Sequence, residues 1–255
     1  MSAITLLVFF SCHRSLANYF SRRYPNHLSS EGDFEFSVFL ANVYAKNRQH
    51  EMVIHLIEKE NPDIVVLIEI NEDWETSLKK ALKNYGTRHV VPREGFYGIS
   101  IFSKIPLKLL EEEDLGSAKI PSLHCAFERA DREIVLWATH PPSPRRFRNW
   151  RARNEQLMNL SRRVSEETRP TLIVGDLNTS PWSASFKISK AGRLRDSAEG
   201  FGIRGTWSAR MPFFMRIPLD SVLVSPEIRV LEHRVLEDVE SDHLPIFVRF
   251  GIIDK

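Results

Sequence analysis

Cysteine is nearly absent from this sequence, whose 255 residues include only Cys12 and Cys125. Two distant cysteines cannot form a disulfide framework, and neither belongs to a CxxC or zinc-type cluster. An excess of one charge is also lacking, because 35 basic and 33 acidic residues leave a net charge of +2. Any attraction for nucleic acid therefore has to be local. No repeat or low-complexity tract is present, which excludes collagen, coiled coil and extended disorder.

Long hydrophobic runs are missing as well. Residues 4–10, ITLLVFF, are all apolar, but a membrane-spanning helix needs about 20 such residues. No basic stretch precedes this run, as a signal peptide would require. Two interpretations stay open: an irregular or helical arm, and the remnant of a membrane anchor. Residues 11–33 lack a clear period and predict a linker. Residues 1–33 are therefore an arm or linker, and residues 34–255 form one domain.

The rest of the chain alternates between short apolar strands and amphipathic helices. One helix carries Met52, Val53, Leu56 and Ile57 on a single face. Strands are predicted at 34–40, 63–70, 88–91, 98–103, 107–111, 124–127, 133–139, 171–174, 219–224, 228–236 and 245–250, and helices at 47–60, 74–85 and 149–165. These strands are too many for one sheet of ordinary size. The pattern predicts an α/β fold with two mixed β-sheets packed face to face and flanked by helices.

Polar residues gather where the apolar runs begin or end. Any one of them would be read as a turn former, but several carboxylates and two histidines exceed what turns require. Residues at strand ends meet at one edge of a sheet, where α/β enzymes build their sites. The set comprises Asn42, Glu69, His140, Asp176, Asn178, Asp220, Asp242 and His243.

Six motifs carry a resemblance to a known family. They are VLIE at 66–69, FYGISIFSK at 96–104, ATH at 138–140, GDLNTSPWS at 175–183, PLDSVLVS at 218–225 and SDHLPI at 241–246. Their content and order resemble the endonuclease/exonuclease/phosphatase superfamily, which has the DNase I-like fold. The resemblance implies a four-layer α/β sandwich, dependence on a divalent metal and hydrolysis of phosphoesters. The departures, among them Ile68 and Ser221, remove no reactive group.

The resemblance also implies a role for each site residue. Glu69 matches the principal metal ligand, with Asn42 and Asp242 completing or orienting its surroundings. Mg²⁺ is the expected ion, with Mn²⁺ as the alternative, since Mg²⁺ prefers hard oxygen ligands. His243 matches the general base, and the ordinary pKa of histidine suits that task.

The remaining roles follow from the same resemblance. Asp220 would orient His243, while Asp176 and Asn178 would lie near the attacking water and a phosphate oxygen. His140 and Tyr97 would contact the phosphate or assist the leaving group.

Two segments bear on the substrate. PRRFRNWRAR at 144–153 could hold phosphates and stack on bases, or it could be a solvated helix start with Trp150 in the core. ARMPFFMRI at 209–217 could touch a lipid surface or pack on the protein body. The predicted substrate-binding residues are Arg145, Arg146, Arg148, Arg151 and Trp182.

Three functions stay open from the sequence. A metal-dependent nuclease that uses a His-activated water for in-line attack is the first. A phospholipid phosphodiesterase of the sphingomyelinase type is the second, and a non-catalytic phosphate-binding module is the third. GTW at 205–207 followed by PLD at 218–220 resembles a bacterial branch whose members often have apolar N-terminal segments. A monomer is expected, either cytoplasmic or membrane-anchored.

Overall fold

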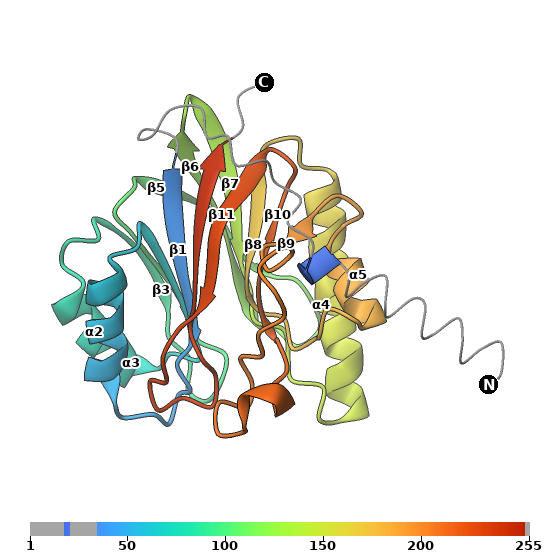
Figure 1. The fold of residues 1–255 in the computed structure, drawn as a ribbon. Coiled ribbons are helices and arrows are strands. Elements are labelled where there is room, and N and C mark those ends of the chain that lie inside the picture. The colour runs from blue at the N-terminus through green and yellow to red at the C-terminus, as the bar shows by residue number, and fades with distance from the viewer. Residues whose placement is uncertain (1–17, 21–34, 253–255) are drawn as a thin grey trace.

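The fold comes from a computed structural model, which describes residues 18–20 and 35–252 (Figure 1). Most of the predicted N-terminal arm, including the apolar run at 4–10, lies outside the described residues. Of that arm, residues 18–20 are helical, and Tyr19 is buried against the domain. The Tyr19 hydroxyl donates to Oδ2 of Asp196 at 2.7 Å. This part of the arm is thus in contact with the body of the protein.

Two six-stranded mixed sheets form the centre of the molecule. The first has the strand order β11-β12-β1-β2-β4-β3, and the second has the order β5-β6-β7-β8-β10-β9. The first contains β1 (Glu35–Asn42), β2 (Ile64–Ile68), β3 (Thr87–Val91), β4 (Ile99–Ser103), β11 (Ile228–Val235) and β12 (Ile246–Ile252). The second contains β5 (Leu107–Asp114), β6 (Pro121–Arg129), β7 (Arg132–Ala138), β8 (Thr171–Asp176), β9 (Arg195–Asp196) and β10 (Asp220–Val224).

The core lies between these sheets because alternate residues of each strand point inward. In β1, Phe36, Val38 and Leu40 enter this core, whereas Phe39 and Ala41 face the other way. The opposing sheet contributes side chains from β6, β7, β8 and β10. The strand IVVLI (β2) supplies both faces, which explains its uninterrupted apolar sequence.

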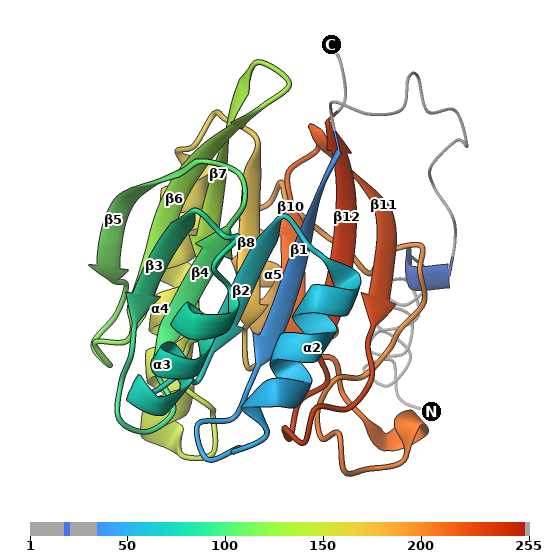
Figure 2. The ribbon, with the colours of Figure 1, turned by 90° about the vertical axis from the view of Figure 1, so that its left-hand side faces the viewer.

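Helices cover the outer face of each sheet, so the molecule has four layers (Figure 2). Helices α2 (His50–Glu60) and α3 (Glu72–Ala81) pack on the first sheet, and α4 (Phe147–Ser165) and α5 (Ala184–Ser189) pack on the second. This confirms the predicted four-layer α/β sandwich. None of the described helices has the length and apolar character needed to cross a membrane.

Three short elements and one helical face differ from the sequence prediction. Helix α5, strand β9 and the single 3-10 turn η1 (Phe213–Met215) were not predicted, because each is too short for a periodic pattern. In α2, Ile54 is buried and Met52 is 41% exposed. The predicted face of this helix was therefore wrong by part of a turn.

Candidate active site

The predicted site residues meet at one end of the two sheets, at the bottom of Figure 1, where β1, β2, β7 and β8 end and β10 begins. They surround a cleft of about 740 Å³. Asn42 and Asp220 are buried beside it. Eight of the predicted residues line it directly: Glu69, Tyr97, His140, Arg145, Asp176, Asn178, Asp242 and His243.

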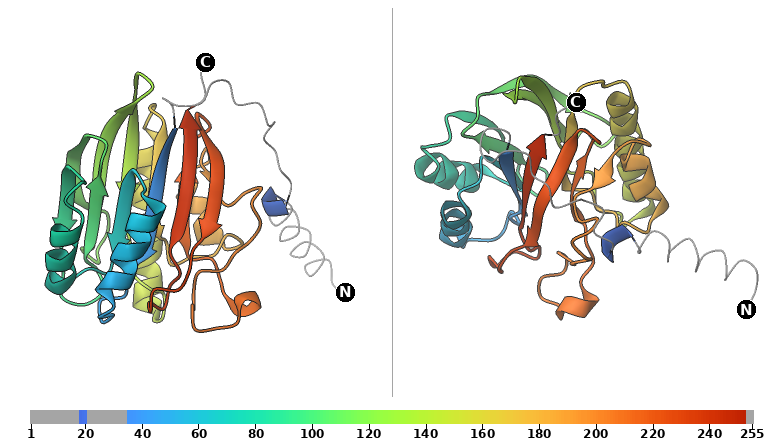
Figure 3. Two further views of the ribbon diagram at one scale, coloured as in Figure 1. Left: turned by 60° about the vertical axis from the view of Figure 1, so that its left-hand side comes forward. Right: turned by 45° about the horizontal axis from the view of Figure 1, so that its top comes forward.

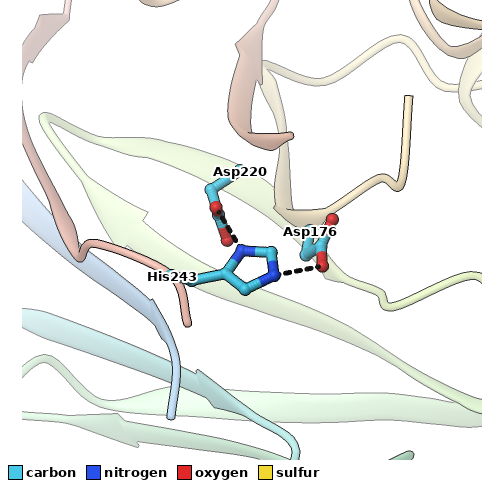
Figure 4. A group of neighbouring side chains, drawn as sticks. All are labelled: Asp176, Asp220 and His243. Atoms are coloured by element: carbon cyan, nitrogen blue, oxygen red, sulfur yellow. Dashed lines mark hydrogen bonds and ion pairs between the residues drawn. The ribbon is translucent and has the colours of Figure 1, made fainter. Parts of the chain in front are cut away.

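His243 lies between two carboxylates (Figure 4). Its Nδ1 is 2.8 Å from Oδ2 of Asp220, and its Nε2 is 3.6 Å from Oδ2 of Asp176. Because a carboxylate only accepts hydrogen bonds, Nδ1 carries a proton and donates it to Asp220. The backbone holds this arrangement in place, since the amide of His243 donates to Oγ of Ser241, which in turn donates to the carbonyl of Asn42.

The pKa of His243 differs from the sequence expectation. Burial opposes the charged form, but Asp220, Asp176 and Asp242 outweigh burial and raise the pKa to about 10. Without a cation, His243 is therefore protonated at neutral pH, and the expectation of an ordinary histidine pKa was wrong. A divalent ion among these carboxylates would oppose the imidazolium charge and lower the pKa again.

Glu69 follows β2 in a left-handed conformation, with φ of 63°. Its amide donates to the carbonyl of Gly98 at 2.8 Å. A Cβ at Gly98 would lie 1.8 Å from the carbonyl oxygen of Ile70, so only glycine permits this approach. Nδ2 of Asn42 donates to Oε1 of Glu69 at 2.9 Å, while Oδ1 of Asn42 accepts from the amide of Tyr44. Asn42 thus orients the Glu69 carboxylate.

The Glu69 carboxylate has an unusual electrostatic environment. Its Oε2 atom is buried and has no hydrogen-bond partner among the described residues. Burial raises the pKa of Glu69, opposed in part by His140 and Asn42. A buried carboxylate oxygen without a donor fits a cation better than it fits an apolar core.

His140 is fully enclosed beside two carboxylates. Its Nε2 lies 3.6 Å from Oδ2 of Asp176 and 4.0 Å from Oε1 of Glu69. Burial lowers the pKa of His140, but the two carboxylates outweigh burial and raise it overall. The ring of Tyr97 lies 5.9 Å from that of His140. Burial and Glu69 raise the pKa of Tyr97, so its hydroxyl keeps its proton and can donate a hydrogen bond.

Asp176 and Asn178 form a tight turn after β8. Burial opposes ionisation of Asp176, but His243 and His140 outweigh burial and lower its pKa. The amide of Asn178 donates to Oδ1 of Asp176, and its Nδ2 donates to the carbonyl of Pro141. Asn178 has a φ of 50°, a conformation that asparagine tolerates. One of its side-chain N–H groups remains to face the cleft.

Asp242 lines the cleft beside His243, whose pKa it helps to raise. The indole Nε1 of Trp207 donates to its Oδ2 at 3.3 Å. Another group of possible metal ligands brings Asp176, Asp220 and His243 within 4.8 Å of one another. In this group Nδ1 of His243 is already hydrogen-bonded to Oδ2 of Asp220, whereas Oδ1 of Asp220, like Oε2 of Glu69, is buried without a hydrogen-bond partner among the described residues.

The arginines of the segment 144–153 fall into two groups, one at the cleft and one outside it. Arg145 lines both the cleft and an adjoining groove, where it meets Arg146, Phe147 and Trp150. Arg148 and Arg151 are exposed on α4 outside the cleft. Trp182 is 40% exposed and also lies outside the cleft lining. Trp150 is 44% exposed, so it is not the core residue that one interpretation of the sequence required.

Arg153 has a structural role. It is buried, and it donates to the carbonyl of Asn178 at 2.6 Å and to Oγ of Ser185 at 3.1 Å. It therefore fixes the turn that carries Asn178 and is not free to hold a substrate.

Several residues of the cleft are not among the predicted site residues. Tyr44, Lys46, Phe96 and Trp207 all line it. The Lys46 ammonium lies 5.9 Å from the centre of the Phe96 ring, a cation–π distance. Tyr44 and Lys46 lie in a loop without hydrophobic periodicity and gave no signal in the sequence, whereas Phe96 and Trp207 belong to the quoted motifs FYGISIFSK and GTW.

Comparison with known proteins identifies the fold and the family pattern. Residues 39–243 match the pattern described as the Endonuclease/Exonuclease/phosphatase family. No sequence among the curated proteins matches this chain.

Solved structures resemble it at low identity. A humanized D. rerio TDP2 is 19% identical with a TM-score of 0.72, over 85% of this chain and 99% of that one. D. rerio TDP2 complexed with single-strand DNA product is 17% identical with a TM-score of 0.69, over 85% and 99%. The mannosyl-6-phosphatase of Bacteroides thetaiotaomicron VPI-5482 is 18% identical with a TM-score of 0.72, over 85% and 100%. At such identities the likeness concerns the fold.

Proposed function

The chain belongs to the endonuclease/exonuclease/phosphatase family and is a phosphoric ester hydrolase, and from this premise we propose that it cleaves phosphodiester bonds of nucleic acid in a metal-dependent reaction. The observation that carries this proposal is the paired arrangement of His243 and Asp220 at a cleft that also contains Glu69. His243 is the proposed general base for in-line attack of water on phosphorus.

Asp220 fixes His243 for this task. The hydrogen bond from Nδ1 to Asp220 places the ring proton of neutral His243 on Nδ1 and leaves Nε2 free to accept a proton. The aspartate has the same orienting role in other His–Asp pairs. Nε2 can accept a proton from water only when it is unprotonated. Asp176, 3.6 Å from Nε2, then stabilises the imidazolium that forms.

The family implies a divalent metal ion, and the residues present fit one. Glu69 would hold it through Oε2, which lacks another partner among the described residues, with Asn42 orienting the carboxylate and Asp242 nearby. Mg²⁺, or Mn²⁺, suits this oxygen-rich site. When bound, the ion would neutralise charge on the phosphate and favour the unprotonated form of His243.

The phosphate would be held by other residues that line the same cleft. Tyr97 and Asn178 each have an N–H or O–H group available to donate to its oxygens, which stabilises the negative charge that develops during attack. His140, whose pKa is raised by Asp176 and Glu69 against the effect of burial, can donate a proton or a hydrogen bond to the leaving group.

The arginine segment supports nucleic acid as the substrate. Its arginines surround the N-terminus of α4, where the first turn has no acidic residue and Arg146 makes no side-chain cap. Positive charge at that end opposes the helix dipole, so these arginines do not stabilise the helix. Phe147 and Trp150 lie nearly parallel at 5.6 Å and are exposed, a surface on which bases can stack. Single-strand DNA is the product bound by the D. rerio neighbour.

A salt series tests this proposal. The four-fold change of Arg145, Arg146, Arg148 and Arg151 to Gln should raise KM for single-stranded DNA more than it lowers kcat, because such contacts act on ground and transition states alike. The difference should shrink between about 50 and 200 mM salt. For bis-p-nitrophenyl phosphate, which has a single phosphate, the KM and kcat of the four-fold variant should differ little from those of the wild type.

Control variants separate substrate binding by the arginine segment from the hydrolytic reaction itself. His243→Ala should lose turnover on both substrates, whereas the exposed His55→Ala on α2 should lose it on neither. Parallel salt curves for wild type and the four-fold variant on DNA would contradict the nucleic-acid proposal.

A second candidate is a phospholipid phosphodiester. It is favoured by one observation, an exposed apolar loop beside the cleft at residues 211–215.

A further inference from the structure

The loop between Trp207 and Ile217 carries five consecutive apolar residues, 211–215, which are here called the apolar tip. Its side chains are uncovered: Met211 is 45% exposed, Phe213 79%, Phe214 73% and Met215 55%. The interpretation that this loop packs on the protein body was therefore wrong. Large apolar side chains grouped in this way on a surface usually mark an interaction site.

The tip is held outward by its own hydrogen bonds. The amide of Met211 donates to the carbonyl of Ser208, and the amide of Met215 donates to that of Pro212, both at 2.9 Å. Arg216 closes the loop, since its guanidinium donates to the carbonyls of Met211 at 2.8 Å and Ala209 at 2.9 Å. Four backbone carbonyls and the Arg216 guanidinium thus fix a turn whose apolar side chains could otherwise fold back.

The base of the loop belongs to the active site. Trp207 and Ile217 line the cleft, and the amide of Ala209 donates to the carbonyl of Asp242 at 2.9 Å. Figure 3 shows the tip, in orange, projecting beyond the ends of the sheets. Anything bound to the tip therefore lies next to the cleft.

Charge and shape indicate what the tip binds. Arg210 and Arg216 flank it, and residues 209–217 contain no carboxylate. Arg145 and the exposed Phe147 lie on the rim at the start of α4. Apolar side chains with basic neighbours are suited to an interface between anionic headgroups and acyl chains.

Other occupants fit less well. Three of the five residues of the tip, Met211, Pro212 and Met215, offer neither an aromatic stacking face nor a donor to nucleic acid. A convex tip of five residues is also much smaller than the roughly 800 Å² per partner of a stable protein interface.

We propose that the apolar tip docks the catalytic end of this protein on an anionic lipid bilayer. This docking goes beyond the proposed function. Because it is measured as binding to vesicles, the result does not depend on which phosphodiester the cleft hydrolyses. A docked molecule would bring its cleft toward the headgroup phosphates.

Vesicle binding by the full chain tests the proposal. Vesicles of phosphatidylglycerol with phosphatidylcholine should bind the wild type more strongly than phosphatidylcholine alone. The double change Phe213→Ser and Phe214→Ser should weaken binding at least about tenfold, since burying one such side chain is worth about a factor of ten. The control is Met158→Ser, which changes a 51% exposed methionine on α4. Both variants should hydrolyse bis-p-nitrophenyl phosphate at the wild-type rate.

A local probe tests the tip directly, whatever the N-terminal residues contribute to vesicle binding. An environment-sensitive fluorophore is attached to Met215→Cys in a Cys12→Ser background, where the remaining Cys125 is buried. Its emission should shift to the blue with anionic vesicles and be quenched by lipid-borne quenchers. The same label at Met158→Cys should do neither.

Several results would overturn the proposal. One is an unchanged tip fluorophore, and another is the same shift at both labelled sites. A double variant that loses affinity for single-stranded DNA and keeps its affinity for vesicles would assign the tip to nucleic acid. A concentration-dependent dimer that only the double variant abolishes would assign the tip to a second copy of the chain.

Discussion

The hydrogen bond between His243 and Asp220 makes the stability of the metal-free protein depend on pH in a calculable way. The pKa of His243 is raised to about 10 by Asp220, Asp176 and Asp242 against the opposing effect of burial. Relative to an ordinary value near 6.5, this corresponds to about 5 kcal/mol, at 1.36 kcal/mol for each pKa unit. Because the folded-state pKa is the higher one, this stabilisation is fully present below about pH 6.5 and is lost as pH rises through about 10.

Replacing Asp220 with Asn removes the carboxylate nearest to the imidazole and keeps its size. We expect Asp220→Asn to lower the free energy of unfolding by about 2–3 kcal/mol at about pH 6, roughly half of the total. The loss should nearly vanish at about pH 10.5, because His243 is then uncharged in both proteins. Any contribution that the other titrating groups make to both proteins cancels in the difference.

The assay is urea unfolding of both proteins between these pH values, in the presence of a chelator. The chelator is needed because a bound cation would itself lower the pKa of His243. Asp131→Asn, a change at an exposed turn residue with φ of 54°, is the matched control and should be neutral throughout. The same loss of stability at both pH values would refute the electrostatic argument and assign Asp220 a packing role only.

Three further predictions follow from the site and the core. His243→Ala should nearly abolish turnover, and adding Asp220→Ala should cost little more, because the pair acts as a unit; rate losses that multiply in the double variant would argue for separate roles. Cys125→Ala should keep wild-type activity and lose some stability to urea, since the buried thiol, with its pKa raised to about 12, behaves as a small apolar side chain. Mg²⁺ at 100 times its Kd should stabilise the wild type by about 2.7 kcal/mol, measured as a rise in Tm. Glu69→Gln should show little of this rise and should lose activity at least about a hundredfold, whereas the exposed Glu72→Gln should behave as wild type.

The sheets could be predicted from the sequence because period-two patterns leave little choice of face. Phe36, Val38 and Leu40 point into the core as their spacing requires. The elements that were missed are those without a period. Strand β9 has two residues and η1 has three, and both exist because surrounding loops close around them. Their placement depends on tertiary contacts that no local pattern encodes.

The site could be predicted in its membership but not in its electrostatics. Motif order identified His243, Asp220 and Glu69 as neighbours. It could not give the pKa of His243, which depends on the distances of 2.8 and 3.6 Å to two carboxylates from different strands. It also could not separate the exposed Arg145 from the buried Arg153, which is bound to the carbonyl of Asn178, because both lie in one basic run beside the cleft.

The charges of the cleft explain why its residues need each other. Glu69 and Asp176 are buried close to two histidines, and each carboxylate would be costly to bury alone. In the metal-free protein burial lowers and the carboxylates raise the pKa of both histidines, and the carboxylates prevail; His243, with a pKa of about 10, carries a balancing proton at neutral pH. A cation at Glu69 would replace that balancing charge and free His243 to accept a proton. The same carboxylates thus couple metal binding to the protonation state of His243, the proposed general base, so activity and metal affinity should rise together as pH increases from acidic values.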